Sequence, residues 1–285
     1  MQYIQGIRFS KQFSEEICKV MRSWKKFCRY TVSEKQKYVY NEDRYSDAGY
    51  EIKVSNQMMD RKENFHVNLR QYSRLVEVQS SNNHEFIDRI PGIMRHLEPI
   101  IIEYAGKVER ETGISGLIQE VLSSKPYWTI RYLHYLHQQN KENPDEPKKQ
   151  IILAKSHIDK HGFTVHLSET EAGVEILSPD ERVWQPITID RRNIGYIMDG
   201  AQIQLRTENR KKAVVHRVVS GLNRERYSLV CFVPLIRTAM YNKSKYGSIQ
   251  SCSGLVTYDL GFTEFRSYFS SVQPSRVDTQ SDDNV

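Results

Sequence analysis

Apolar residues recur at steps of three and four over residues 10–32, the spacing of one face of an amphipathic helix. A second pattern of this kind covers residues 87–111, with Pro91 near its first turn, and a short helix is expected over residues 113–123. Residues 71–84 are expected to form a loop. We expect the helices to pack on the outside of a sheet and to support it.

The second half of the chain changes to short, strand-like apolar runs. A strand is expected over residues 127–137, and the charged stretch 138–149, with two prolines, is interpreted as a solvated excursion rather than a lid. From residue 151 onward the runs are separated by turn-forming residues at 169–173, 178–181, 199–200, 208–211 and 223–225. Many short strands at this spacing predict a sandwich or a double-stranded β-helix, the jelly roll.

Two remaining stretches carry weaker signals. Over residues 33–68 several tyrosines alternate with charged residues, a pattern that suits either base stacking or half-buried loop anchors. Acidic residues there are at least as numerous as basic ones, which favours anchors. Near the end, residues 241–258 lack strong periodicity, residues 262–269 are expected to form a final helix, and residues 273–285 to be disordered.

Composition narrows the class of protein. Of 285 residues 27% are charged, and no run of 18 apolar residues or secretory signal is seen, so we expect a soluble cytoplasmic protein that binds no membrane. The net charge is +6, yet the 41 Lys and Arg are interspersed with 35 Asp and Glu, so no nucleic acid is expected as a partner. Four cysteines without C-x-x-C spacing suggest free thiols. Oligomeric state is left open.

The stretch from residue 151 to residue 177 carries the candidate chemistry. His157 and Asp159 are two residues apart in a β-prone run, so they are expected on one face of a strand. His216 follows 59 residues later in a second such run. Two histidines and one carboxylate can hold non-haem Fe(II) with positions left open. His134, His161 and His166 are nearby alternatives, and strand alternation would turn His166 to the opposite face if no bulge intervenes.

A second polar pair follows His216. Arg226 and Ser228 are again at i and i+2, and a guanidinium with a hydroxyl can hold the far carboxylate of a diacid. The other interpretation of Arg226 is an arginine that pairs with an acidic residue across the sheet.

With these residues, the sequence resembles the isopenicillin N synthase-like branch of the Fe(II)/2-oxoglutarate-dependent dioxygenases. The motifs are H-x-D at His157, H-R-V at His216 and R-x-S at Arg226, and Gly173 and Trp184 lie between them. Upstream, residues 131–135, 49–50 and 61–65 resemble the family's R-x-L-x-Y, G-Y and K-E-x-F segments, so that the likeness covers roughly residues 10–270.

The resemblance implies a mainly β fold with flanking α-helices and a double-stranded β-helix (jelly roll, cupin-like) core. It implies that His157, Asp159 and His216 bind Fe(II), and that Arg226, Ser228 and Tyr135 bind the cosubstrate 2-oxoglutarate. The core is expected over residues 126–270, after a shortened N-terminal region of helices and strands over 1–125 that packs on it, and a disordered tail is expected over 271–285.

Three departures from the family pattern are visible. Gly6-Ile7 is interpreted as the remnant of a turn, which leaves the N-terminal strand shortened or missing. Asp199-Gly200 stands in reversed order relative to the family's Gly-Asp, and Leu136 stands where the family commonly has proline. Leu136 makes the match of Tyr135 to the family pattern weaker, whereas the reversal at Asp199-Gly200 is not expected to touch the metal ligands.

The implied activity is the oxidation of a small molecule with O2, 2-oxoglutarate being converted to succinate and CO2. Hydroxylation is the default outcome, and desaturation or cyclisation are alternatives. Two other functions stay open: an Fe(II) oxidase like isopenicillin N synthase or aminocyclopropane carboxylate oxidase that uses no 2-oxoglutarate, and a non-catalytic metal-binding jelly-roll module. Candidates to line the substrate pocket are Arg131, Lys155, Phe163 and Phe232.

Overall fold

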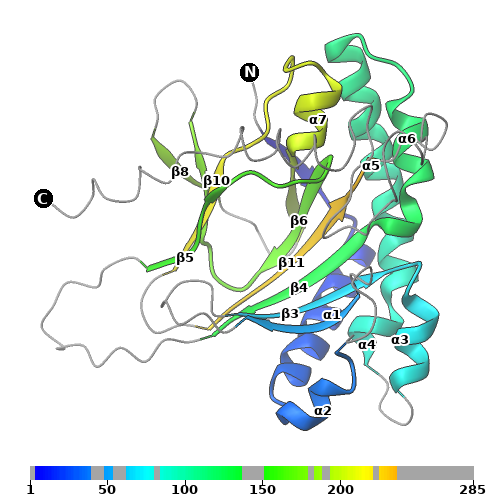
Figure 1. Cartoon of the computed structure of the whole chain (residues 1–285), viewed down its shortest axis with the longest axis vertical. Helices are drawn as coiled ribbons and strands as arrows, with labels where there is room; N and C mark the ends of the chain where they lie inside the picture. The colour runs from blue at the N-terminus through cyan, green and yellow to red at the C-terminus, as the bar shows by residue number, and fades with distance from the viewer. Residues whose placement is uncertain are drawn as a thin grey trace, which may run out of the picture.

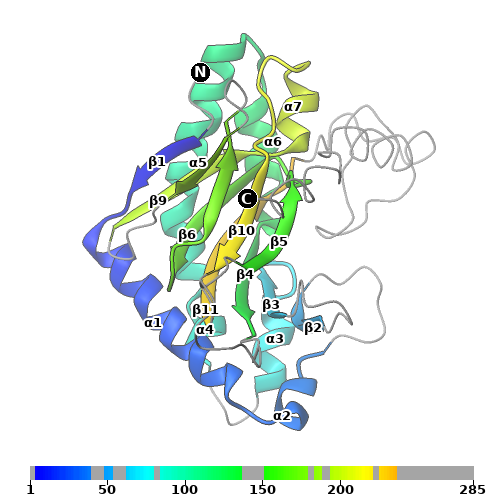
Figure 2. The same cartoon turned by 90° about the vertical axis from the view of Figure 1, so that its left-hand side faces the viewer.

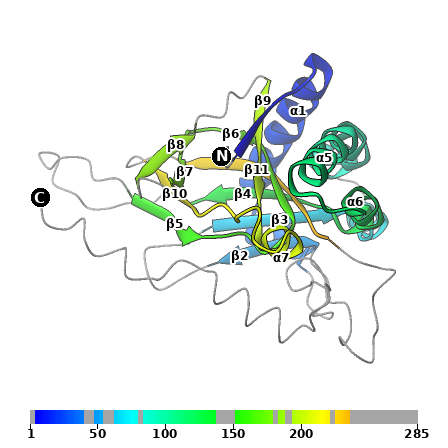
Figure 3. The ribbon, with the colours of Figure 1, turned by 90° about the horizontal axis from the view of Figure 1, so that it is seen from above.

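Two antiparallel β-sheets form the core, and most helices lie against the outer face of the larger sheet (Figure 1 and Figure 3). The structure, a computed structural model, describes residues 4–39, 48–53, 62–79, 84–136, 151–178, 183–187, 193–220 and 225–235. The arrangement has the mainly β core and flanking helices that the sequence predicts.

Within the part of the chain that the structure describes, the larger sheet has seven strands in the order β1-β9-β6-β11-β4-β3-β2. In chain order these are β1 (Ile4–Arg8), β2 (Gly49–Lys53), β3 (Lys62–Asn68), β4 (Thr129–Tyr135), β6 (Phe163–Glu169), β9 (Ile194–Asp199) and β11 (Arg226–Val233). Three strands thus come from the region before residue 126, and the predicted strand at the K-E-x-F-like segment is β3, which pairs with β4.

Among the described residues, the smaller sheet has four strands in the order β5-β10-β7-β8. They are β5 (Ile151–His157), β7 (Val174–Leu177), β8 (Trp184–Ile187) and β10 (His216–Ser220). One apolar cluster joins the sheets: Ala154 and Val218 of the smaller sheet pack with Leu133, Val230 and Phe232 of the larger. The inner faces of the two sheets therefore enclose the middle of the jelly roll.

Helices cover the opposite face of the larger sheet (Figure 2). They are α1 (Lys11–Cys28), α2 (Val32–Gln36), α3 (Tyr72–Gln79), α4 (Glu85–Asp88), α5 (Ile90–Thr112) and α6 (Leu117–Ser123), with a 3₁₀ turn at Lys125–Tyr127 and α7 (Ala201–Arg206) at the end of β9. No helix among the residues described is long and apolar enough to cross a membrane.

Helix α1 shows how the amphipathic pattern produces this packing. The Ser10 hydroxyl caps its first turn by accepting from the Phe13 amide at 3.1 Å. Trp24 is fully buried on the apolar face, and its indole Nε1 donates to the carbonyl oxygen of Leu133 at 3.2 Å. The helix is thereby attached to β4, the strand that also carries Tyr135.

Each strand of the larger sheet divides its side chains between two environments. On β11, Leu229, Cys231 and Val233 belong to the large core under the helices, whereas Val230 and Phe232 belong to the cluster between the sheets. Both faces are covered, so every residue of β11 and of β6 is buried. The inward positions, which need not be apolar, are the ones available for chemistry.

Two expectations about local structure are wrong, and one helix was not expected. Gly6 and Ile7 lie within strand β1, which pairs with β9 at the edge of the sheet, so an N-terminal strand is present where a turn remnant was expected. The expected loop over 71–84 contains helix α3, whose amphipathic pattern is too short to stand out. The turn signal at Asp199-Gly200 does mark the end of strand β9, but helix α7, with Gly200 as its N-cap, was not expected to follow it.

Some predictions fall outside the described residues. These are the excursion over 138–149 and, beyond residue 235, the stretch 241–258, the helix over 262–269 and the disordered tail.

Candidate active site

Two histidines and one aspartate converge where β5 and β10 pair. His157 is the last residue of β5, His216 is the first of β10, and their Cα atoms are cross-strand partners. Asp159 Oδ1 lies 3.8 Å from His157 Nε2, and Asp159 Oδ2 lies 3.8 Å from His216 Nε2. One ligand atom from each residue lies within 4.8 Å of the other two. The structure thus brings together the three residues predicted to bind a metal ion, while the role itself stays a prediction.

Backbone carbonyl groups orient both imidazole rings. His157 Nδ1 lies 2.7 Å from the carbonyl oxygen of Lys155, and His216 Nδ1 lies 3.1 Å from that of Val214. A proton on each Nδ1 would make these contacts hydrogen bonds and leave the Nε2 lone pairs facing Asp159. This is the arrangement in which a histidine is held ready to bind a metal through Nε2.

The surroundings of the three residues favour an ionised Asp159 carboxylate beside a neutral His157 imidazole. Burial raises the pKa of Asp159, but the neighbouring His216 and His157 outweigh burial and hold the pKa well below its ordinary value. A hydrogen bond of 2.6 Å from Thr164 Oγ1 acts in the same direction. Burial, followed by the neighbouring His216, lowers the pKa of His157 to about 4. The protonation states are those that bind a metal ion.

Asp159 does not lie on a strand, as the i, i+2 pattern suggested, but in the loop after β5. The start of helix α7 holds this loop: the Ala201 amide donates to the Asp159 carbonyl oxygen at 2.8 Å, and the Gly200 amide donates to that of Gly162 at 2.8 Å. A Cβ atom on Gly200 would collide with the carbonyl oxygen of His161. Glycine at this position therefore allows the helix start to approach the loop that carries the carboxylate.

Arg226 lies on the inner face of β11 and is 1% exposed. Its Nη2 donates to Glu169 Oε2 at 2.5 Å, its Nη1 lies 3.4 Å from Ser228 Oγ, and its Nε donates to the Glu171 carbonyl oxygen at 3.3 Å. Its Cζ lies 5.2 Å from the centre of the Tyr135 ring, on the neighbouring strand β4. The three predicted cosubstrate residues therefore lie together, with a buried acid that was not predicted.

Glu169 provides the pairing of the alternative interpretation of Arg226, an arginine that pairs with an acidic residue across the sheet. It is 2% exposed and lies opposite Ser228 in the pairing of β6 with β11. The register of this pair shifts between Leu229 and Val230, a bulge that turns Glu169 inward. The sequence places Glu169 at a turn signal and gives no sign of the bulge, so sequence analysis missed it. Arg226 consequently has a carboxylate partner before any cosubstrate is considered.

Gly173 holds the same region together. Its carbonyl oxygen accepts from the Val219 amide at 2.8 Å, and a Cβ atom on it would lie 3.0 Å from Arg226 Nε and collide with the Val219 carbonyl oxygen. Glycine here leaves room for the guanidinium.

His166 is placed differently from the expectation. It pairs with the inward-facing Val230 and follows the inward-facing Thr164 by two residues on β6, so it faces the middle of the jelly roll. The loop after His157 interrupts the strand and transfers the chain to the other sheet, so alternation could not be counted across it. The expectation that His166 faces away is wrong.

The four residues predicted to line a substrate pocket do not lie together in the structure. Arg131 Cζ lies 4.5 Å from the centre of the Phe232 ring, and Phe232 belongs to the cluster between the sheets. Phe163 is fully buried under the helices, with its ring 5.1 Å from that of Tyr104, so it does not line the inner face. Lys155 is exposed. Arg131 and Phe232 remain candidates on grounds of position.

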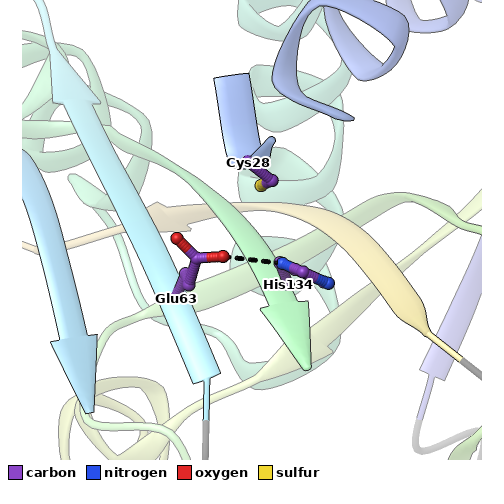
Figure 4. A group of neighbouring side chains, drawn as sticks. All are labelled: Cys28, Glu63 and His134. Carbon is purple, nitrogen blue, oxygen red and sulfur yellow. Dashed lines mark hydrogen bonds and ion pairs between the residues drawn. The ribbon is translucent and has the colours of Figure 1, made fainter. Parts of the chain in front are cut away.

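A second group of metal-type side chains lies outside this site. Cys28 from α1, Glu63 from β3 and His134 from β4 point toward one another (Figure 4), with one potential ligand atom from each within 4.8 Å of the others. The ammonium group of Lys35, however, lies 2.5 Å from Glu63 Oε2 and 2.6 Å from the Cys28 carbonyl oxygen. Burial, reinforced by Glu63, raises the pKa of the Cys28 thiol, which disfavours the thiolate that a metal needs. This group fits a buried ion pair better than a metal site.

The Glu63 network is expected to contribute strongly to stability. Burial raises the pKa of Glu63, but hydrogen bonds from His134, Lys35 and Tyr50 outweigh burial and lower the pKa to about 2. Because this pKa lies below that of the unfolded chain, the contribution is present above about pH 4.5 and is lost as the pH falls toward 2, with a size on the order of 3 kcal/mol. Urea unfolding of the wild type and of Glu63→Gln at pH 7 and at pH 3 measures it.

The half-buried pair Lys125–Glu98, with a separation of 2.7 Å, is the matched control. Glu98→Gln should change the free energy of unfolding by less than about 1 kcal/mol, because both side chains are partly solvated. Equal effects of Glu63→Gln and Glu98→Gln would show that the buried network adds no stability.

Comparisons with known proteins agree with this geometry. Residues 126–234 match the model of the family described as the 2OG-Fe(II) oxygenase superfamily. Nothing in the match distinguishes the isopenicillin N synthase-like branch. No curated protein sequence matches the chain.

Solved structures share the fold over most of the chain. A rice dioxygenase for auxin oxidation (DAO) aligns with a TM-score of 0.64 and 17% identity, covering 94% of this chain and 85% of its own. JOX2 in complex with 2OG, Fe and JA aligns with a TM-score of 0.67 and 17% identity, covering 94% and 77%. A full-length Neurospora crassa protein in complex with alpha-KG and thymine gives 0.62 and 16%, covering 93% and 87%. At these identities the likeness establishes the jelly-roll fold.

Proposed function

We propose, on the premise that residues 126–234 belong to the 2OG-Fe(II) oxygenase superfamily, that this protein is an Fe(II)/2-oxoglutarate-dependent dioxygenase acting on a small molecule. The observation that carries the proposal is the convergence of His157, Asp159 and His216 at one end of an enclosed inner face that also presents Arg226 and Ser228. Hydroxylation is the default reaction, with desaturation or cyclisation as variants. The isopenicillin N synthase-like branch is proposed on the sequence motifs alone.

The donor set supports iron. Two imidazole nitrogens and one carboxylate oxygen make up the set typical of non-haem Fe(II) oxygenases, and they leave coordination positions for a chelating keto acid and O2. Bound there, the iron would supply the oxidising chemistry. Thr164 and the start of α7 hold Asp159, and the carbonyl groups of Lys155 and Val214 orient the imidazole rings.

The second end of the site supports a dicarboxylate with one complication. Arg226 Nη1 and Ser228 Oγ lie 3.4 Å apart and can both donate to the distal carboxylate of 2-oxoglutarate. Glu169 occupies Nη2 of the same guanidinium. The distal carboxylate would thus share Arg226 with Glu169. The two carboxylates are both negatively charged, and in a buried site their repulsion would weaken the binding of 2-oxoglutarate.

This complication favours one alternative specifically. An Fe(II) oxidase without 2-oxoglutarate would leave the Arg226–Glu169 pair intact, with both side chains at most 2% exposed. A non-catalytic metal-binding module has less support, because such a module would need neither Arg226 nor Ser228 on the inner face.

Anaerobic loading with Fe(II) followed by titration with 2-oxoglutarate tests the proposal. A visible metal-to-ligand charge-transfer band from the chelated keto acid is the expected result. Iron binding without the band would favour the oxidase, and the absence of iron binding would favour the non-catalytic module.

A further inference from the structure

His166 lies on β6 between the two ends of the proposed site. Two residues before it, Thr164 donates to the Asp159 carboxylate at 2.6 Å. Three residues after it, Glu169 pairs with Arg226 at 2.5 Å. At about 3.3 Å per residue, β6 therefore connects the metal end with the guanidinium end, and His166 occupies the interval.

The side chain of His166 faces into that interval. Its Cα partner on β11 is Val230, which belongs to the cluster between the two sheets. The bulge between this pair and the Ser228–Glu169 pair lets both His166 and Glu169 point inward, although they are three positions apart in the sequence. Without the bulge, one of the two would face the helices.

His166 is also a buried polar side chain with a ring nitrogen that lacks a hydrogen-bond partner among the described residues. Its side chain is 8% exposed, and within the described part of the chain its Nε2 has no hydrogen-bond partner. Burying a polar atom without a partner is unfavourable, so such atoms in folded proteins usually serve a ligand, a water or a reaction. An apolar residue would have packed against Val230 without that cost.

The charge state of His166 suits a neutral hydrogen-bond donor. Burial lowers the pKa of His166 to about 3, and the charges that act on it come from His216, Asp159, Arg226 and His157. These charges belong to both ends of the site, which agrees with a position between them. His166 is not part of the ligand group itself, whose members are His157, Asp159 and His216.

We propose that His166 is a cosubstrate-binding residue, whose Nε2–H donates a hydrogen bond to a carboxylate oxygen of 2-oxoglutarate bound between the metal ligands and Arg226. The inference rests on the proposed function. It also gives the bound dianion a donor in addition to Arg226 and Ser228, in a site where Glu169 already occupies part of the Arg226 guanidinium. The unpartnered Nε2 of His166 would thus supply a hydrogen bond at a site where Arg226 is shared with Glu169.

Calorimetric titration of 2-oxoglutarate into Mn(II)-loaded protein under nitrogen tests this without relying on turnover. His166→Leu removes the donor, His166→Gln keeps an amide donor, and His96→Leu makes the same change in helix α5, where His96 stacks on Phe13. We expect Kd for 2-oxoglutarate to rise on the order of ten-fold in His166→Leu. It should recover in part in His166→Gln and stay unchanged in His96→Leu. Mn(II) affinity should be equal in all.

A stability measurement adds a readout that a structural role would not give. Because His166→Leu removes an unpartnered polar atom, the Tm of the metal-free protein should stay the same or rise. A fall in Tm together with an unchanged Kd would overturn the inference, as would a Kd that rises equally in His96→Leu. If the wild type itself binds no 2-oxoglutarate, the proposed function fails together with this inference. If the wild type and His166→Leu bind 2-oxoglutarate equally well, only the inference about His166 fails.

If His166→Leu does not fold, a measurement on the wild type and on His166→Gln still tests the inference. Addition of 2-oxoglutarate to Zn(II)-loaded protein should produce a downfield imidazole N–H proton resonance that is missing from His166→Gln. The same resonance in both proteins, or in neither, would overturn the inference.

Discussion

Asp159→Ala is expected to weaken Fe(II) binding by on the order of 100-fold or more and to abolish oxidative turnover. Asp159 lies 3.8 Å from both His157 Nε2 and His216 Nε2 and supplies the only carboxylate of the ligand group. Loss of a residue that merely orients a metal ligand already costs about 10- to 100-fold in affinity, so loss of the ligand should cost more. Equilibrium dialysis against Fe(II) or Mn(II) measures the affinity.

A suitable control for this variant is Asp88→Ala. Asp88 accepts a hydrogen bond from Gln79 in the helix layer and should be irrelevant to the metal. Circular dichroism should show both variants folded, because Asp159 is in a loop and its removal leaves Thr164 with only a small loss. Full turnover of a folded Asp159→Ala protein would contradict the proposed metal site.

Glu169→Gln and Arg226→Gln should change 2-oxoglutarate binding in opposite directions. Glu169→Gln keeps an acceptor for Arg226 Nη2 but removes the negative charge next to the incoming carboxylate. We expect the affinity for 2-oxoglutarate to increase by on the order of 100-fold, since charges about 5 Å apart in a protein interact by roughly 3 kcal/mol and each factor of ten corresponds to about 1.4 kcal/mol. Arg226→Gln removes the cation that both carboxylates need and should weaken binding by about 2–5 kcal/mol. Titration of the Mn(II)-loaded protein measures both.

The double variant Arg226→Gln/Glu169→Gln separates binding from folding. Arg226→Gln alone leaves Glu169 buried without its charged partner, which destabilises the fold, whereas the double variant leaves no unpaired charge. The double variant should therefore be more stable than Arg226→Gln and still bind 2-oxoglutarate poorly. Weaker binding in Glu169→Gln would mean that Glu169 serves to hold Arg226 in position and does not compete with the cosubstrate.

Much of the fold followed from periodicity. Helix α1 was predictable because one apolar face recurs over 18 residues, and the run of short strands after residue 150 was predictable from the turn residues between them. Helices α3 and α7, of 8 and 6 residues, were missed because a pattern of two turns is too short to distinguish from a loop. Strand β1 was missed because its pairing with β9, 186 or more positions away, is invisible locally.

The predicted site residues came together to different degrees. His157, Asp159 and His216 are adjacent because two strands of one sheet pair at their ends, which the H-x-D and later histidine pattern suggested. The reason given for placing Asp159 beside His157 was wrong. Asp159 is positioned by a loop that the start of α7 holds, and not by the alternation of side chains along a strand. Phe163 was misplaced because its face on β6 depends on where the strand begins after that loop.

The sequence by itself determined which residue types are available and where amphipathic and β-prone segments lie. It also supplied the motifs on which the superfamily and the expected metal and cosubstrate residues depend. Only the tertiary structure decided what shares the inner face with them. A bulge in the pairing of β6 and β11 turns both His166 and Glu169 inward, and register shifts of this kind arise from contacts between strands about 60 residues apart in the chain. The physical reason is that strand periodicity fixes faces only within an uninterrupted, regularly paired strand, while loops and bulges reset it.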